Sequence, residues 1–414
     1  MTDATQKTFM PFKEFIALMA LLMSVTALSI DAVMPALSVM GKDLNAVGEN
    51  QTQLVISVLF LGFTFGQLIY GPISDSFGRK RAVYIGLTIF LIGSTLSLFS
   101  ASFETMLMGR MLQGFGAAAA RVISVAMIRD QYSGRDMARV MSFVMAVFIL
   151  VPALAPSIGQ LILYAASWRF IFVMFLVAAL VAMVWMYFRL PETLIKEKRI
   201  PFRVGPIWSG VKFSVTNKTT CGYALCAGIM FGAFIGYLTS AQQIFQDFYK
   251  VGDMFALYFA VLALAVGGAS FANSAVVKRF GMRCICRVSI LCIMSFAGVF
   301  LLCSMITDNQ VPFWGFMIFG FMTFSGFGFL FGNLNAIAME PVGHIAGVAS
   351  AFVGAFSSAI SVVVGSLIGQ SFNMTLIPLS MGFLLCSVAA FILQLWLDKG
   401  IDDSVPKAAD KQAV

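Results

Sequence analysis

Charge and histidine are scarce in this chain. Only 11% of its 414 residues are charged, and His344 is its one histidine. A typical soluble domain has about 25% charged residues. Hydrophobic residues make up 60% of the sequence. This composition excludes an ordinary soluble domain and a histidine-based metal site, and it predicts an all-α protein that crosses a membrane several times.

The seven cysteines form no metal-binding or redox pattern. All lie in the second half, within or beside apolar segments. Cys284 and Cys286 are one residue too close for a C-x-x-C motif, and there is no second pair. We expect small buried hydrophobes at these positions, with no bound metal and no cofactor.

The net charge of +8 does not indicate a nucleic-acid partner. The basic residues occur in short pieces between apolar runs, whereas a nucleic-acid surface usually places them on one stripe with aromatic neighbours. We therefore interpret them as signals of membrane topology.

Long apolar runs make up most of the sequence. Breaks that carry charges or turn residues separate twelve runs, each about 20 residues or slightly longer, the length that spans a bilayer. We predict spans near residues 14–38, 52–72, 82–101, 105–128, 138–161, 168–188, 221–244, 254–277, 285–305, 312–335, 346–371 and 375–397.

The first run resembles a signal peptide because Lys7 and Lys13 precede it. It continues past Met34 without a cleavage pattern of small residues, so we expect an uncleaved first span.

The distribution of lysine and arginine predicts the orientation. An even number of spans places both termini on one side, and the segments expected there hold 22 of the 27 basic residues. The other face holds only Lys42, Arg169 and Lys250. By the positive-inside rule, both termini are expected in the cytoplasm.

The longest loop divides the spans into two sets of six. It carries three prolines and the basic run 196–199. We expect a six-helix bundle over 1–188, a cytoplasmic linker over 189–220, a second bundle over 221–397 and a cytoplasmic tail over 398–414.

A weak internal repeat indicates that the two bundles are related. Ser76-Phe-Gly-Arg-Lys80 follows the second span, and the similar Arg279-Phe-Gly-Met-Arg283 follows the eighth, 203 residues later. The second copy has Lys278 where the first has Asp75. Two pseudo-symmetric six-helix bundles are the expected architecture.

Three charged residues fall inside predicted spans, where charge is costly and usually functional. Asp31 lies in the first span, and Arg110 and Arg121 lie eleven residues apart in the fourth, so the two arginines project from nearly one helix face. An ion pair between Asp31 and Arg110 that only fixes packing is one interpretation. The other is a polar cavity in which Asp31 exchanges a proton in competition with substrate.

Proline, glycine and amide residues supply the remaining candidates. Pro152, Pro156 and Gly159 in the fifth span permit a bend or close helix packing, and a static kink is the alternative. Several polar residues inside spans could line a cavity or pair with neighbouring helices; these are Gln67, Gln113, Asn333, Asn335 and Gln370.

Six motifs carry a resemblance to a known family. They are Gly71-x-x-x-Asp75-x-x-Gly78-Arg79-Lys80-Arg81, Arg110-x-x-Gln113-Gly114-x-Gly116, Pro152-x-x-Ala155-Pro156-x-x-Gly159, Asp31-x-x-x-Pro35, Met127-Ile-Arg129-Asp130 and the segment Glu340 to Ser350. With them, nearly the whole chain resembles the major facilitator superfamily, specifically its twelve-span drug/proton antiporters of the bicyclomycin and chloramphenicol resistance type.

The resemblance implies a monomeric exporter of small amphipathic drugs in the bacterial inner membrane, driven by the proton gradient without a cofactor. It implies that Asp31 binds the proton or the substrate, that Arg110 with Gln113 tunes it, and that Asp75 holds a cytoplasmic gate. Three features depart from the family pattern: Ala155 stands before Pro156 where glycine is usual, Gln160 follows Gly159 where a second glycine is usual, and Arg121 is an additional charge.

Two other functions fit parts of the sequence. A transporter of a specific metabolite on the same fold is the nearer one, and the span-five motif argues against import. A membrane-embedded enzyme or sensor is the other, but the spans hold no cluster of acids or nucleophiles from which to build an active site.

Overall fold

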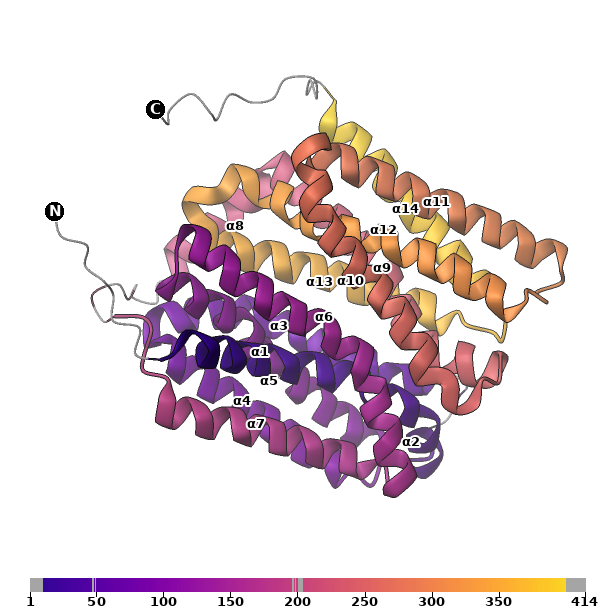
Figure 1. Ribbon diagram of the computed structural model, residues 1–414, viewed down its shortest axis with the longest axis horizontal. Helices are drawn as coiled ribbons and strands as arrows, with labels where there is room; N and C mark the ends of the chain where they lie inside the picture. The colour runs from indigo at the N-terminus through magenta and orange to yellow at the C-terminus, as the bar shows by residue number, and fades with distance from the viewer. Residues whose placement is uncertain are drawn as a thin grey trace.

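The computed structural model describes residues 10–46, 48, 50–195, 197, 199 and 204–399, and its regular elements are all helices. Twelve segments within these ranges are long and apolar enough to cross a membrane. The prediction of an all-α protein with twelve spans is confirmed, and the helices form two bundles (Figure 1).

The first bundle is built from the first half of the chain. Its helices are α1 (Phe12–Asp31), α2 (Leu37–Asp43), α3 (Leu54–Phe77), α4 (Arg79–Leu98), α5 (Phe103–Gln131), α6 (Gly134–Ala165) and α7 (Arg169–Arg189), with short 3₁₀ turns η1 (Met34–Ala36) and η2 (Gln51–Gln53).

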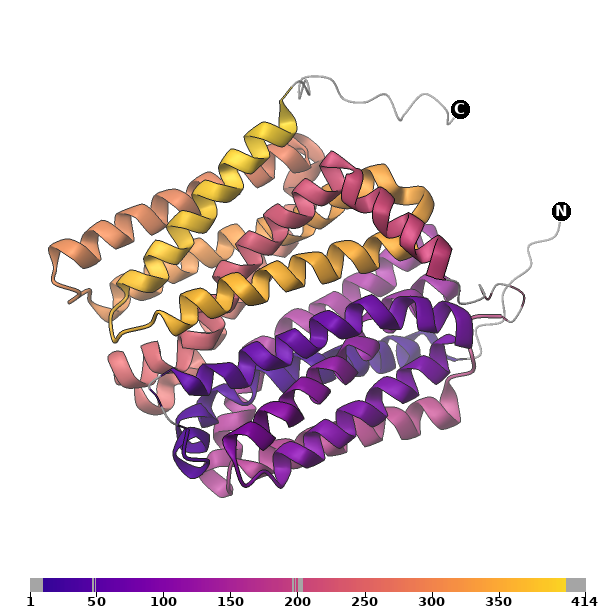
Figure 2. The ribbon, with the colours of Figure 1, turned by 180° about the vertical axis from the view of Figure 1, so that it is seen from behind.

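The second bundle repeats this arrangement. It contains α9 (Lys218–Gln242), a π-helical turn η4 (Gln243–Phe248), η5 (Gly252–Met254), α10 (Phe255–Phe280), α11 (Met282–Ile306), α12 (Phe313–Met339), η6 (Glu340–Ile345), α13 (Ala346–Gln370) and α14 (Ile377–Asp398). Seen from behind, α3 of the first bundle and α13 of the second run side by side along the boundary between them (Figure 2).

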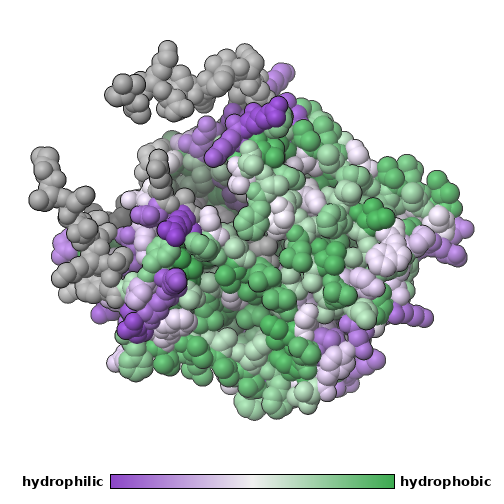
Figure 3. Space-filling model, viewed as in Figure 1, coloured by the Kyte–Doolittle hydropathy of each residue, from purple (hydrophilic) through white to green (hydrophobic). Residues whose placement is uncertain are grey.

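The surface matches a protein surrounded by lipid. Hydrophobic residues cover the middle of the molecule, and hydrophilic residues lie at its two ends (Figure 3). We call the end at which α3 meets α4, with Arg79, the basic side. The opposite end, with Asn50 and Gln370, is called the amide side. The chain enters α1 and leaves α14 on the basic side (Figure 1).

The predicted linker contains a helix that the sequence analysis did not predict. Residues Val204–Thr216 form α8, which packs against α13 and α9. A proline in the first turn of a helix is tolerated because the amide hydrogens there have no partner within the helix, so Pro206 is compatible with it. The prolines and charges of this region had indicated only a loop.

The first span is broken where its acid lies. The helix α1 ends at Asp31, and the chain turns through η1 before α2. Pro35 stands four residues after Asp31 and has no amide hydrogen, so it cannot donate to the Asp31 carbonyl as the fourth following residue of a helix would. The Asp31-x-x-x-Pro35 spacing thus places the carboxylate at a helix end.

Candidate functional site

Arg110 is the largest charged side chain buried in the first bundle. Its exposed fraction is 0%, and its guanidinium joins three helices. Nε donates to the Val55 carbonyl at 2.9 Å, and Nη2 donates to the Ser29 carbonyl at 2.8 Å. Nη1 donates to Gln113, whose own amide donates to the Ser94 hydroxyl at 2.8 Å. Arg110 is therefore held by neutral groups.

Asp31 lies two residues beyond the Ser29 carbonyl that Arg110 binds, so the two charges sit at similar depth, as the sequence predicted. They form no ion pair with each other. Asp31 is 5% exposed, and the described residues provide its carboxylate with neither a hydrogen-bond donor nor a cation in contact. A buried acid without a partner is unfavourable unless it can take up a proton or a ligand. This is the arrangement that a binding acid requires.

Arg121 lies further toward the basic side on the same helix as Arg110. Its guanidinium is 5.6 Å from the centre of the Phe63 ring on α3. Both arginines thus contact α3, in agreement with the expectation that they share a helix face.

Gly159 brings α6 directly against the break in the first span. A methyl group added at Gly159 would stand 2.0 Å from the Ala32 carbonyl oxygen and 3.1 Å from the Pro35 ring. Pro156, one turn earlier, is also buried, and Pro152 is half-buried. The motif therefore fits α6 closely to the segment that follows Asp31. Gln160, the departure from the family pattern, lines a cavity of about 450 Å³ with Pro35.

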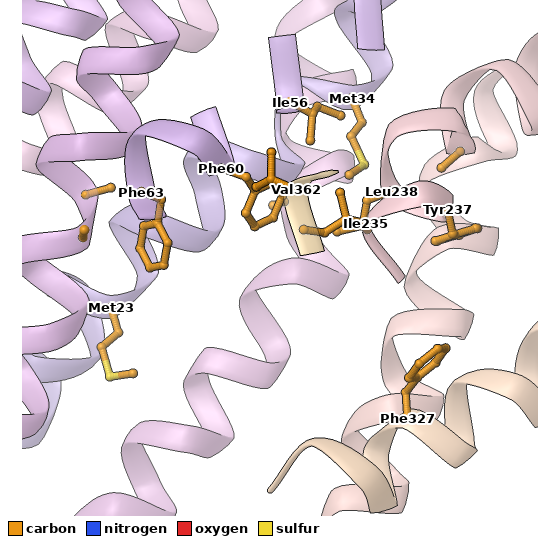
Figure 4. Packing of buried hydrophobic residues seen from close by; sticks show 14 of the residues in the cluster. Met23, Met34, Ile56, Phe60, Phe63, Ile235, Tyr237, Leu238, Phe327 and Val362 are labelled. Atoms are coloured by element: carbon orange, nitrogen blue, oxygen red, sulfur yellow. The ribbon is translucent and has the colours of Figure 1, made fainter. Parts of the chain in front are cut away.

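Aromatic residues of the second bundle cluster at its boundary with the first bundle. Phe231 and Phe234 on α9 contact Phe331 on α12, with ring centres 5.3 and 5.9 Å away. Phe60 on α3 reaches Phe231 across the boundary at 6.2 Å. Figure 4 shows Met34, which follows Asp31, beside Ile235 and Leu238 of α9. The sequence did not indicate which of its 42 phenylalanines would gather here.

The amide residues proposed for a cavity are engaged in hydrogen bonds between or within helices. Gln67 donates to the Ser358 hydroxyl on α13 at 2.8 Å, and Asn333 donates to Asn273 on α10 at 2.9 Å. Asn335 is exposed and donates to the Phe331 carbonyl of its own helix. For Gln67 and Asn333, the structure thus shows the pairing that the sequence left as an alternative to lining a cavity.

Gln370 belongs to a set of amides that joins the two bundles on the amide side. It donates to the Asn50 carbonyl at 2.9 Å, and the Asn50 amide donates to the carbonyls of Gln370 at 3.0 Å and Phe372 at 2.7 Å. Gln243 donates to the Asn50 side chain at 3.0 Å and accepts from Gln53. We call Asn50, Gln53, Gln243 and Gln370 the amide latch. Of these, the sequence analysis had singled out only Gln370.

The basic side carries an ionic network within the first bundle. Arg79 is 8% exposed, pairs with Asp75, and donates through Nε to Asp130 at 2.9 Å.

The same motif approaches the second bundle. Gly71, a half-buried residue of the motif, lies near Ala351 of α13. Asp75 also lies near the start of α13, since a methyl group added at Gly347 would stand 3.8 Å from its Oδ2. The helix dipole favours an anion at that position, although Asp75 accepts its hydrogen bond from Arg79.

Glu192 completes this network and was missed by the sequence analysis. Its carboxylate accepts from the backbone amides of Arg79 at 2.8 Å and Lys80 at 3.2 Å, at the N-terminus of α4. Gly78 has φ 102°, and a methyl group there would stand 2.5 Å from Glu192 Oε2. Lys80 in turn donates to the Leu190 carbonyl at the end of α7, whereas Arg81 is exposed. The glycine is needed both for its backbone conformation and to admit the carboxylate.

The second bundle has an equivalent turn, between α10 and α11, with different charges around it. Gly281, the counterpart of Gly78, also has positive φ, at 76°. Arg283 pairs with Glu340 at 3.4 Å and with Asp398 at 3.5 Å, and Asp398 also accepts from Arg287 at 3.1 Å. Glu340, at the start of η6, is thus held by a cation of α11. Lys278, which replaces the acid, is exposed.

Comparison with known proteins supports the same architecture. The profile of the Major Facilitator Superfamily matches residues 19–366. The Uncharacterized MFS-type transporter YdgK of Bacillus subtilis is 31% identical, with 85% of this chain and 87% of that protein aligned. A Bicyclomycin resistance protein homolog of Haemophilus influenzae is 30% identical, over 92% of this chain and 96% of that protein.

Among solved structures, the partially occluded inward-open form of the xylose transporter XylE from E. coli is similar in fold. It covers 94% of this chain and 98% of its own, with a TM-score of 0.73 and 12% identity. At that identity the likeness concerns the fold alone. The family match and the relatives, taken together with the twelve spans, show that this chain belongs to the Major Facilitator Superfamily and is a membrane transporter, not an enzyme.

Proposed function

We propose that this protein exports small amphipathic drugs, such as amphenicol- or bicyclomycin-like compounds, in exchange for protons. The observation that carries the proposal is the Asp31 carboxylate, which is buried in a span without a hydrogen-bond or ion-pair partner among the described residues. Relatives described as resistance proteins support the substrate class.

Proton exchange follows from the surroundings of Asp31. Burial favours the neutral, protonated acid, while a cation or a hydrogen-bond donor brought by a substrate favours the carboxylate. Arg110, whose Nη2 donates to the Ser29 carbonyl two residues before Asp31, lies at similar depth. Substrate binding and proton binding therefore oppose each other, and this reciprocal linkage is the requirement for antiport.

Alternating access needs bundles that move as units. The ionic networks around Arg79 and Arg283 each lie within one bundle, and Gly159 packs α6 against the turn after Asp31. A change at Asp31 can thus be transmitted to α6. In this structure the amide latch is formed, while α6 and α10 diverge toward the basic side (Figure 1). We infer a state closed on the amide side.

We further propose that the basic side faces the cytoplasm of a bacterium and that the protein works as a monomer in the inner membrane. The excess of lysine and arginine on that side supports the orientation. In this scheme the proton gradient supplies the driving force and no cofactor takes part.

A susceptibility panel tests this function. In an efflux-deficient bacterium, expression of the chain should raise the inhibitory concentration of one or more amphipathic drugs severalfold, and a protonophore should abolish the protection. Asp31→Asn at equal expression serves as the matched inactive control. Protection that persists with the protonophore would reject proton coupling, and a panel without any protected drug would reject drug efflux.

A further inference from the structure

The junction between α8 and α9 carries positive charge that its own segment does not balance. Asn217 alone separates the two helices, and the exposed residues Lys212 and Lys218 stand on either side of it. The sequence from Lys198 to Gln246 contains no aspartate and no glutamate. The two lysines therefore favour an anion that comes from outside this segment.

Lys218 reaches from α9 onto the end of α14. Its Nζ lies 4.1 Å from the centre of the Trp396 ring and donates to the Trp396 carbonyl at 3.1 Å. The acid in the last turn of α14, Asp398, is buried and accepts from Arg287 at 3.1 Å and pairs with Arg283 at 3.5 Å. Because an ammonium group has three donors, Lys218 can bind a further acceptor in addition to the carbonyl.

An exposed apolar stripe of α14 begins at this lysine. Trp396, Ile392 and Leu385 are four and seven residues apart, so they lie on one helix face, and each is more than half exposed. Tryptophan at the end of a span is typical of the level at which lipid headgroups lie. The stripe therefore suits acyl chains, with Lys218 at the height of their headgroup.

The helix α8 presents a second tryptophan and the second lysine, on the basic side of the molecule (Figure 1). Its inner face packs on α13, where a methyl group added at Gly210 would stand 2.9 Å from Val348, and Ser214 one turn later is fully buried. Trp208 and Lys212, also one turn apart, are exposed on its outer face. An outer face with tryptophan and lysine is typical of helices that lie in the membrane interface.

The end of α7 in the first bundle has similar residues, but its cations are engaged within the protein. Lys80 donates to the carbonyls of Tyr187 at 3.2 Å and Leu190 at 2.7 Å. Arg189 donates two hydrogen bonds of 2.7 Å to the Glu14 carboxylate, which neutralises its charge. The two bundles thus differ in the positive charge that they present to the lipid.

We propose that the α8–α9 junction and the end of α14 bind one anionic phospholipid. The phosphate accepts hydrogen bonds from Lys218 and Lys212, and the acyl chains lie along the stripe from Trp396 to Leu385. Clustered lysines beside a span attract anionic headgroups, and the bilayer that the chain crosses supplies the lipid. This site is separate from the proposed drug efflux and does not depend on it.

Native mass spectrometry of the purified full-length protein tests the site, because it resolves each bound lipid. Delipidated protein is titrated with phosphatidylglycerol and, separately, with zwitterionic phosphatidylcholine of the same acyl chains. The wild type should bind the first phosphatidylglycerol about 25-fold more tightly, or about fivefold for each lysine. The double variant with Lys212→Gln and Lys218→Gln should bind the two lipids alike.

Two variants serve as controls. Lys278→Gln removes an exposed cation from α10, at the same end of the second bundle, and should keep the wild-type preference. The double variant with Lys212→Arg and Lys218→Arg keeps both charges and should keep the preference as well.

Glycerol phosphate distinguishes a lipid site from a general anion site. It carries the phosphate without acyl chains, so an excess should not displace the bound phosphatidylglycerol, and displacement would overturn the inference. Equal affinity of the wild type for both lipids, an unchanged preference in the glutamine double variant, or the same loss in Lys278→Gln would also overturn it. The measurement contains no drug, so its outcome is independent of the proposed drug efflux.

Discussion

The two ends of the boundary between the bundles are held by different chemistry. On the basic side the strong contacts are ionic, and those between described residues lie within one bundle, as in Arg79 with Asp130 and Arg283 with Asp398. On the amide side the contacts cross the boundary and are neutral, as in Asn50 with Gln370 and Gln53 with Gln243.

The difference follows from what each contact must do during a transport cycle. Separating a partly buried ion pair leaves unpaired charges, which costs several kcal/mol. A neutral hydrogen bond contributes only about 1 kcal/mol net, because water replaces the partner. Charges can therefore stabilise each bundle as a rigid body, whereas amides can close a boundary that has to open again.

Loss of Arg79 should have the larger effect on stability. Arg79→Gln leaves Asp75 and Asp130 without their cation, and we expect the free energy of unfolding to fall by about 2–3 kcal/mol. The midpoint of thermal unfolding in detergent should decrease by about 3–6 °C. Because the Arg79 ion pairs lie within one bundle, their loss should shift the balance between open states less than loss of Asn50 does.

The control for Arg79 is its exposed neighbour Arg81. Arg81→Gln removes the same charge from the same helix and should leave the unfolding midpoint unchanged. A midpoint for Arg79→Gln equal to that of Arg81→Gln would contradict the structural role of the network.

Loss of Asn50 should have a smaller effect on stability and act instead on conformation. Asn50→Ala removes the hydrogen bonds to Gln370, Phe372 and Gln243 that join the bundles. We expect the population open on the amide side to rise about tenfold. Spin labels can report it through the distance between Phe99→Cys and Ile306→Cys, in a background without native cysteines. These residues are 76% and 81% exposed on the amide side.

Gln51→Ala is the matched control for this measurement, since Gln51 follows Asn50 directly, at the start of η2, and forms no side-chain bond with another described residue. It should leave the distance distribution unchanged. If Asn50→Ala lowered the unfolding midpoint as much as Arg79→Gln and did not shift the distances, the division between rigid bundles and a reversible latch would be wrong.

Much of the fold could be predicted because a bilayer imposes it. Helices alone satisfy their own backbone in hydrocarbon, so twelve apolar runs become twelve spans. Two details escaped prediction for local reasons. The helix α8 lies in a segment whose prolines and charges are typical of a loop. The break at Asp31 can be predicted only if Pro35 is recognised as a residue without an amide hydrogen for the Asp31 carbonyl.

The site could be predicted where a charge stands alone in a span, as with Asp31, Arg110 and Arg121. The partners of these charges could not be predicted, because the partner residues are distant in the sequence and often neutral. Arg110 binds the backbone of Ser29, and Glu192 binds the backbone of Arg79 more than 100 residues away.

Proton release on drug binding tests the central proposal most directly. Purified wild-type protein in weakly buffered detergent solution should release protons when chloramphenicol is added, because the substrate displaces the proton of Asp31. Asp31→Asn should show no release at equal folded concentration. Undiminished release by Asp31→Asn would contradict the account and remove Asp31 from the transport cycle.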